Sequence, residues 1–191
     1  AQGLQVMKMC ESLAKVADVE LVLPHRFNWI KKDPFDYYGI AEAFKIKKLP
    51  CLDLTPWDKY LGHLALWIGS ISFVFFAFCY FLFKKADIIY TRDKFFLPLF
   101  FLKNNFMVEM HTFPKNHFLY SLFLKRIKKI VVITQQLKEL FIGLGIAPAK
   151  ILVAADGVDL ENFDINETQE NCRRKLDLPQ NKKIVLYTGH L

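Results

Sequence analysis

The chain has 191 residues, enough for one domain with a packed core, or for one domain and the first piece of another. Hydrophobic residues make up 53% and aromatic residues 15% of it, which excludes a disordered protein. The formal net charge of +7 favours anionic partners, and four scattered cysteines without a C-x-x-C pair indicate neither a disulfide framework nor a zinc site.

The predicted elements alternate between helix and strand. Apolar residues recur at helical spacing from Leu4 to Ala17, which predicts an amphipathic first helix. Apolar runs typical of buried strands follow at 19–24, 87–92, 106–111, 129–134 and 150–159, the last ending in a turn. The clearest later helix is 135–145, with Gly145 placed to end it. Strands separated by helices usually pair in parallel, so the predicted fold class is α/β, a Rossmann-like doubly wound parallel sheet.

The segment 64–83, LALWIGSISFVFFAFCYFLF, carries no charge and is long enough to cross a hydrocarbon core of about 30 Å. A crossing would put the strands at 19–24 and 87–92 on opposite sides of the bilayer, whereas one sheet needs both in one compartment. We therefore expect a buried helix or a helix on a membrane surface. Nearby lysines, including Lys84 and Lys85, suit contact with anionic lipid or form a solvated basic surface.

The composition becomes polar and highly charged from Asp159 to Lys183, which is typical of a linker between domains. A short helix is expected within it at 167–176, before Pro179. The run KIVLYTG then indicates a fresh strand that leads to a glycine turn. The predicted organisation is a Rossmann-like domain at 1–158, a linker at 159–181 and the first strand of a further domain at 182–191.

Three residues near predicted element ends are candidates for binding or chemistry. Gly3 precedes the first predicted helix, where backbone N–H groups either hold a phosphate or form an ordinary turn. Glu109 and His111 fall at the carboxyl end of a predicted parallel strand, where open α/β sheets bind ligands, although a single histidine there is often structural.

Further candidates lie toward the end of the chain. Asp156 and Asp159 flank Gly157 in a tight turn, and they either line a hinge or sugar pocket or simply stabilise that turn. Gly189 would end the last strand and leave room for a ligand near the backbone. No metal-ligating cluster is visible in the sequence, and the dinucleotide fingerprint G-x-G-x-x-G is absent.

Several stretches, taken in order, resemble the family 4 glycosyltransferases of the GT-B architecture: GLQVMKMCESLAK, ELVLPHR, DIIYTRD, VEMHTFPK, KIVVITQQLKELFIGLGI, KILVAADGVDLENFD and KIVLYTGHL. The most specific stretches are DGVDLENF, similar to the family's (N/D)-G-V-D-x-x-x-F segment, and VLYTGHL, similar to the opening of its second domain. The resemblance covers nearly the whole chain. It implies an acceptor-side domain that lacks its first strand, a linker and the start of a donor-binding domain.

Residue roles carry over only where residues match the family's motifs. The resemblance gives Gly3 the glycine-loop position near the donor phosphates, and gives His111 the role of hydrogen-bonding the transferred sugar. Gly189 corresponds to a loop glycine near the diphosphate, followed here by His190 where many members have arginine. The two-glutamate donor motif is missing from this chain, which is therefore expected to be a poor catalyst by itself.

The resemblance implies a hexosyltransferase that moves a sugar from a nucleotide-diphosphate sugar to an acceptor hydroxyl with retention, without a cofactor or metal. The acceptor, a glycan or a lipid-linked molecule, is expected at 26–63, where aromatic and basic residues mix. We expect a cytoplasmic protein in peripheral contact with the anionic inner face of the cell membrane. The alternatives are a membrane protein with a span at 64–83 and a non-catalytic nucleotide-binding module. Nucleic acid is not expected, because Lys and Arg are spread along the chain.

Overall fold

The computed structural model describes residues 2–100, 104–158, 160 and 166–187. The chain divides into two compact units, Ala1–Ala155 and Asp156–Leu191. This division lies close to the boundary predicted at 158, and each unit is described by itself.

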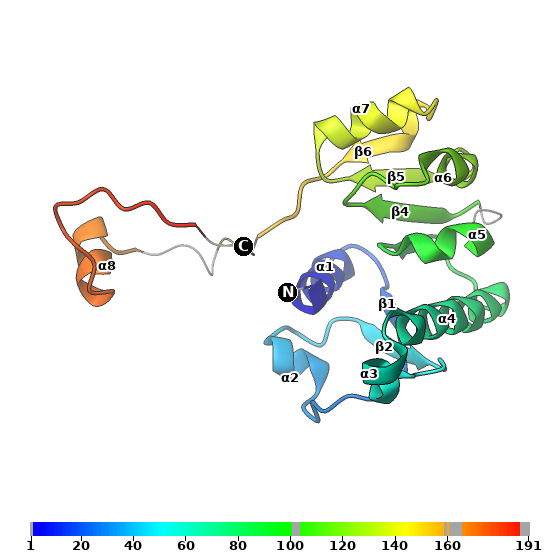
Figure 1. Ribbon diagram of the computed structural model, residues 1–191, viewed down its shortest axis with the longest axis horizontal. Helices are drawn as coiled ribbons and strands as arrows, with labels where there is room; N and C mark the ends of the chain where they lie inside the picture. The colour runs from blue at the N-terminus through cyan, green and yellow to red at the C-terminus, as the bar shows by residue number, and fades with distance from the viewer. Residues whose placement is uncertain (1, 101–103, 159, 161–165, 188–191) are drawn as a thin grey trace. The chain divides into compact units, whose positions relative to one another are not determined.

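Parallel strands form two sheets in the first unit (Figure 1). The four-stranded sheet has the order β3 (Ile89–Thr91), β4 (Phe106–Met110), β5 (Lys129–Val132) and β6 (Ile151–Val153). The two-stranded sheet pairs β1 (Glu20–Pro24) with β2 (Lys45–Leu49). All of these pairs are parallel, so the prediction of an α/β, Rossmann-like parallel fold is confirmed. Among the described residues, no ladder hydrogen bond joins the two sheets, and Arg92, which follows β3, donates to Gln5 of α1.

The helices connect these strands and extend into the second unit. They are α1 (Gln2–Ala14), α2 (Pro34–Tyr38), α3 (Asp58–Leu61), α4 (His63–Phe83), α5 (Leu97–Phe100), α6 (His117–Leu124), α7 (Gln135–Gly143) and, in the second unit, α8 (Gln169–Lys175). Short 3₁₀ turns are η1 (Thr55–Trp57), η2 (Lys94–Phe96) and η3 (Pro148–Lys150). Local chemistry sets the ends of α7: the Thr134 hydroxyl accepts a hydrogen bond from the Leu137 N–H at 3.2 Å, and Gly145 follows the helix at φ +78°.

The main core lies around the four-stranded sheet. β4 and β5 are almost continuously buried, as expected for parallel strands covered by helices. Phe78 and Phe81 of α4, Leu124 of α6 and Phe141 of α7 pack with the strand residues of this core. A smaller core joins Met7 and Cys10 of α1 to Phe44, and burial raises the pKa of the Cys10 thiol to about 11.

Some predicted elements differ from the structure. The basic stretch at 44–48 was not predicted as a strand, yet most of it lies in β2, where Lys45 pairs in register with Glu20 of β1. Three lysines in five residues hide the apolar alternation that marks a strand. In the second unit, α8 confirms the helix predicted at 167–176. Residues 183–187 carry no helix or strand assignment, so the strand predicted there stays a prediction.

The apolar segment 64–83 forms helix α4, but most of it is not buried. By length and composition α4 could cross a membrane, and only 17% of its most apolar window is covered by the rest of the protein. Of the two placements expected for this helix, burial in the core is therefore wrong. The helix is nevertheless attached to the first unit, because the Leu52 N–H donates to Ser72 Oγ at 2.9 Å and Tyr80 donates to Glu20 at 2.6 Å.

The contact between α4 and β1 predicts a pH-dependent contribution to stability. The hydrogen bond from Tyr80 lowers the pKa of Glu20 below its usual value, and the nearby Lys84 lowers it further by a smaller amount. A carboxyl group with a lowered pKa stabilises the fold above its unfolded pKa, and this contribution is lost as the pH falls through its folded pKa. We expect Tyr80→Phe to cost about 1 kcal/mol in urea unfolding at pH 7 and clearly less near pH 3. Equal losses at both pH values would contradict this assignment.

Candidate functional site at the end of strands β3 and β4

Polar side chains converge where β3 and β4 end. These strands pair Thr91 with Val108 in parallel register, so the next residues, Arg92 and Glu109, come level with each other. Tyr90 precedes on β3, and His111 follows on the chain leaving β4. The site therefore forms at the carboxyl edge of a parallel sheet, where open α/β sheets bind their ligands.

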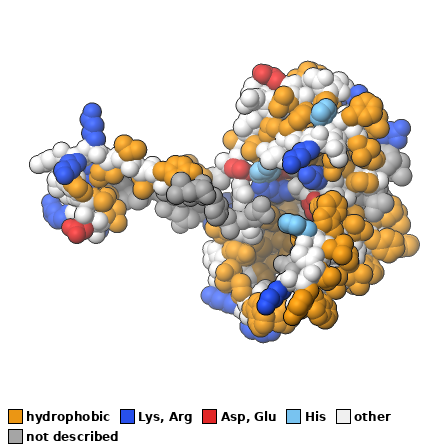
Figure 2. Space-filling model, in the orientation of Figure 1, with side chains coloured by type: hydrophobic (Ala, Val, Ile, Leu, Met, Phe, Trp, Pro, Cys, Tyr) orange, Lys and Arg blue, Asp and Glu red, His pale blue; other side chains and the backbone are white. Residues whose placement is uncertain are grey.

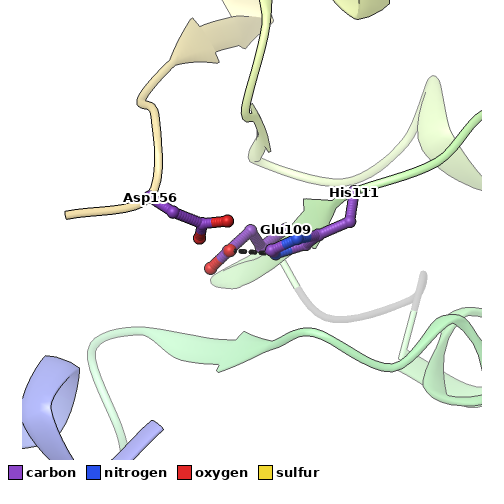
Figure 3. A group of neighbouring side chains, drawn as sticks. All are labelled: Glu109, His111 and Asp156. Carbon is purple, nitrogen blue, oxygen red and sulfur yellow. Dashed lines mark hydrogen bonds and ion pairs between the residues drawn. The ribbon is translucent and has the colours of Figure 1, made fainter. Parts of the chain in front are cut away.

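The Glu109 carboxylate is the centre of this cluster. Its side chain is 7% exposed, and its Oε1 forms an ion pair with Arg92 Nε at 3.3 Å. The Tyr90 hydroxyl donates to Oε2. The His111 ring donates to Oε1 (Figure 3). Two hydrogen bonds and one ion pair thus compensate the cost of burying this carboxylate. Because its oxygens are occupied, Glu109 is suited to hold its neighbours in place and not to react.

The hydrogen-bond network assigns the proton on His111. Nε2 lies next to Glu109 Oε1 and 2.5 Å from Arg92 Nη2, while Nδ1 lies 3.4 Å from the same Nη2. A carboxylate only accepts and a guanidinium only donates, so one ring nitrogen cannot serve both. We assign the proton to Nε2, facing Glu109, and leave Nδ1 to accept from Arg92. Glu109 thereby fixes both the tautomer and the orientation of the ring.

Helix α1 reaches the same cluster through Gln5. Its side-chain Oε1 accepts from Arg92 Nη1 at 3.2 Å and from Nη2 at 3.3 Å. The guanidinium is therefore held by Gln5 on one side and by Glu109 and His111 on the other. A fixed positive charge at the edge of a sheet suits an anionic group on a ligand.

Gly3 lies in the first turn of α1, and not before the helix as predicted. Its N–H is still among those that a helix leaves without an intrahelical partner. A Cβ added at Gly3 would collide with the hydroxyl of Tyr38. The missing side chain therefore makes room for Tyr38, which is a structural reason for glycine at this position.

The remaining predicted residues belong to the second unit or lie outside the described residues. Asp156, which Figure 3 also draws, and Gly157 are exposed residues of the second unit. Asp159, Gly189 and His190 lie outside the described residues. The sequence prediction missed Gln5, Tyr90 and Arg92. The argument that selected Glu109 and His111, polar residues two apart at a strand end, applies equally to Tyr90 and Arg92 and could have found them.

A small pocket of about 190 Å³ lies between the predicted acceptor region at 26–63 and the first turns of α4. Its lining is Arg26, Asp53, Thr55, Ala65, Leu66 and Gly69. The buried Nε of Arg26 has no hydrogen-bond partner among the described residues. Asp53 is engaged, because it accepts from Thr55 Oγ1 at 2.5 Å and from the Phe27 N–H at 2.6 Å. These hydrogen bonds hold the pKa of Asp53 below its usual value, and the bond from the Thr55 hydroxyl has the largest effect. Arg26 is thus the group in this pocket that is suited to an incoming anion.

The residues of the sheet-edge cluster do not favour a metal ion. Carboxylate oxygen and imidazole nitrogen are common metal ligands. Here, however, Glu109 and His111 are bonded to each other, and the Arg92 guanidinium beside them repels a cation.

Comparison with protein-family models gives no match, and comparison with curated proteins gives none either. The function of this site must therefore be inferred from its own residues and from the resemblance of the sequence motifs.

Proposed function

We propose that this chain is the acceptor-side part of a glycosyltransferase that moves a sugar from a nucleotide-diphosphate sugar to an acceptor hydroxyl, with retention of configuration. The observation that carries the proposal is the cluster of Arg92, Glu109 and His111 at the carboxyl edge of a parallel sheet. The motif resemblance supports it, because the strand VEMH that supplies Glu109 and His111 is one of the matching stretches.

The cluster suits the charge that develops in such a reaction. When the bond to the sugar breaks, the nucleotide diphosphate leaves with a growing negative charge, and donors already in place stabilise it best. Arg92 offers a guanidinium held by Gln5 and Glu109. His111 would hydrogen-bond the transferred sugar, and Glu109 acts as a positioning residue for both. The donor sugar is a substrate in this proposal, and no further cofactor is needed.

The pocket at Arg26 is our candidate for a charged group of the acceptor. The Arg26 guanidinium would bind the phosphate of a lipid-linked acceptor, and the exposed rings of Phe27 and Trp29 beside it suit a sugar or lipid chain. A cytoplasmic location follows from this proposal, because nucleotide-diphosphate sugars are the donors it requires.

The test uses the complete protein encoded by the reading frame that contains these residues. We expect it to transfer sugar from one member of a panel of nucleotide-diphosphate sugars. His111→Ala should lower kcat/KM about a hundredfold, the usual effect of removing one well-placed donor. The control is His117→Ala, because this exposed histidine stacks on Phe113 at the start of α6, away from the strand ends that carry the cluster.

Two results would overturn the proposal. One is equal activity in the His111→Ala and His117→Ala proteins. The other is nucleotide binding without any transfer or hydrolysis of the sugar, which would favour the non-catalytic nucleotide-binding module.

A further inference from the structure

The three tryptophans of this chain are all exposed. Trp29 is 84% exposed, Trp57 55% and Trp67 51%. Tryptophan is highly buried on average in soluble proteins, and contiguous apolar surface usually marks a place where something binds. The surface that carries these side chains therefore requires an explanation.

Helix α4 presents an exposed apolar stripe beside them. Its members are spaced three, four, four and seven residues apart and are each more than half exposed: Leu64, Trp67, Ile71, Phe75 and Leu82. The residues that α4 buries against the first unit are Ala65, Gly69, Ser70, Val74 and Ala77. At 100° per residue the two sets are centred on opposite sides of the helix, and Val74 lies at their border, close in direction to Trp67. One side of α4 is thus committed to the protein, and the other is apolar and uncovered.

Hydrogen bonds join the tryptophan-bearing loops to this helix. The Phe27 N–H donates to Asp53 at 2.6 Å, which connects the loop of Trp29 to the loop before Trp57. The residue before Asp53, Leu52, donates its N–H to Ser72 of α4 at 2.9 Å. We call the exposed residues of these segments the apolar face: Phe27, Trp29, Ile30, Trp57, Tyr60, Leu64, Trp67, Ile71, Phe75 and Leu82. In Figure 2 hydrophobic side chains gather over the part of the larger unit where Figure 1 has α3 and α4.

Lysines accompany the apolar face. Lys31 and Lys32 directly follow Trp29 and Ile30, and Lys59 lies between Trp57 and Tyr60. Lys84 and Lys85 follow the last turn of α4, and all five lysines are exposed. Tryptophan and tyrosine rings prefer the head-group level of a bilayer, and nearby lysines are attracted to anionic lipids. A second copy of this chain would bring the same positive charges together, which disfavours self-association through this face.

We propose that the apolar face docks on the surface of an anionic lipid bilayer, with α4 lying in the plane of the interface. The contacts of α4 oppose a transmembrane placement. Tyr80 and Lys84 bind Glu20 at the start of β1, and Ser72 binds the backbone of Leu52. If α4 crossed the bilayer, these contacts would break or would draw a polar strand edge into hydrocarbon, where its backbone groups cannot be satisfied. Docking leaves every one of these contacts intact and covers only side chains that are already exposed.

The experiment is flotation of the protein with lipid vesicles, with tryptophan fluorescence as a second readout. We expect binding to vesicles that contain phosphatidylglycerol, a blue shift of the emission, and much weaker binding to phosphatidylcholine alone. The double variant Trp67→Ser, Ile71→Ser should lower the affinity at least about tenfold, because it removes two apolar side chains from the centre of the face. Lys31→Gln with Lys32→Gln should reduce the preference for phosphatidylglycerol and its sensitivity to salt.

The matched control is Leu140→Ser with Leu152→Ser. These two residues are similarly exposed, and they lie on α7 and on β6 at the opposite edge of the four-stranded sheet from β3. Circular dichroism and urea midpoints of both double variants verify that the fold is retained. The control should bind vesicles like the parent protein.

The proposal is overturned if the protein does not bind vesicles, if it binds both compositions equally, or if the control variant loses as much affinity as the α4 variant. Membrane association that resists alkaline carbonate would instead indicate a transmembrane span. A dimer that the α4 variant abolishes, without vesicle binding, would show that a second copy occupies the face. Vesicle binding needs no sugar transfer, so this inference can fail or succeed independently of the proposed function.

Discussion

Replacing Glu109 by alanine is expected to lower the free energy of unfolding by about 3–5 kcal/mol, the usual cost of removing one member of a buried ion pair. The carboxylate is buried, accepts hydrogen bonds from Tyr90 and His111, and forms an ion pair with Arg92. Without it, the Arg92 guanidinium remains in the site with its charge uncompensated, and the Tyr90 hydroxyl loses its acceptor. Urea unfolding followed by circular dichroism at pH 7 measures the difference.

Two further variants separate charge from shape at this position. Glu109→Gln keeps the size of the side chain and an acceptor for Tyr90, so its loss should be smaller than that of Glu109→Ala. Combining Glu109→Ala with Arg92→Leu removes both charges, and the double variant should be less destabilised than the sum of its single variants. A loss below about 1 kcal/mol for Glu109→Ala would show that the ion pair contributes little to folding.

Phe141→Ala is expected to cost a similar amount, about 3–5 kcal/mol, for a different reason. Phe141 is fully buried on α7, and its ring packs 5.3 Å from that of Phe113. Truncation removes apolar area from the core and leaves a cavity that the parallel strands around it cannot close. The expected result is a lower urea midpoint with an unchanged slope of the transition.

The neighbouring residue on the same helix provides the control for this effect. Leu140 is 45% exposed, so Leu140→Ala should cost less than about 1 kcal/mol while changing helix propensity very little. If both variants lose the same free energy, burial of Phe141 in the core is not what stabilises α7 against the sheet.

The central strands and α7 were predictable because their buried positions are occupied by apolar residues, which form a visible pattern in the sequence. β4 and β5 read as continuous apolar runs because both of their faces are covered. By contrast, β2 is lysine-rich, and its place in a sheet depends on pairing with β1, which composition does not reveal. The short helices α2 and α6 were missed for a related reason, since a few residues cannot establish a helical period.

The candidate site was predicted in part. Glu109 and His111 could be located from a strand end alone, because the carboxyl edge of a parallel sheet follows from topology. Arg92 lies 19 positions from His111 and 87 positions from Gln5 along the chain. Only the folded structure brings these groups within hydrogen-bond distance. For the same reason the sequence could not show that Gly3 makes room for Tyr38.

The α/β class and the apolar helix follow from the amino-acid sequence alone, because both depend on patterns along the chain. How these elements are used depends on contacts in the folded protein. The tertiary structure divided the strands into two sheets, surrounded Glu109 with three polar partners, and covered only one side of α4. The physical reason is that burial and hydrogen bonding depend on distances in space between residues far apart in sequence. The composition of a hydrophobic segment shows that it can be buried. Which of its sides is buried depends on its neighbours in the fold.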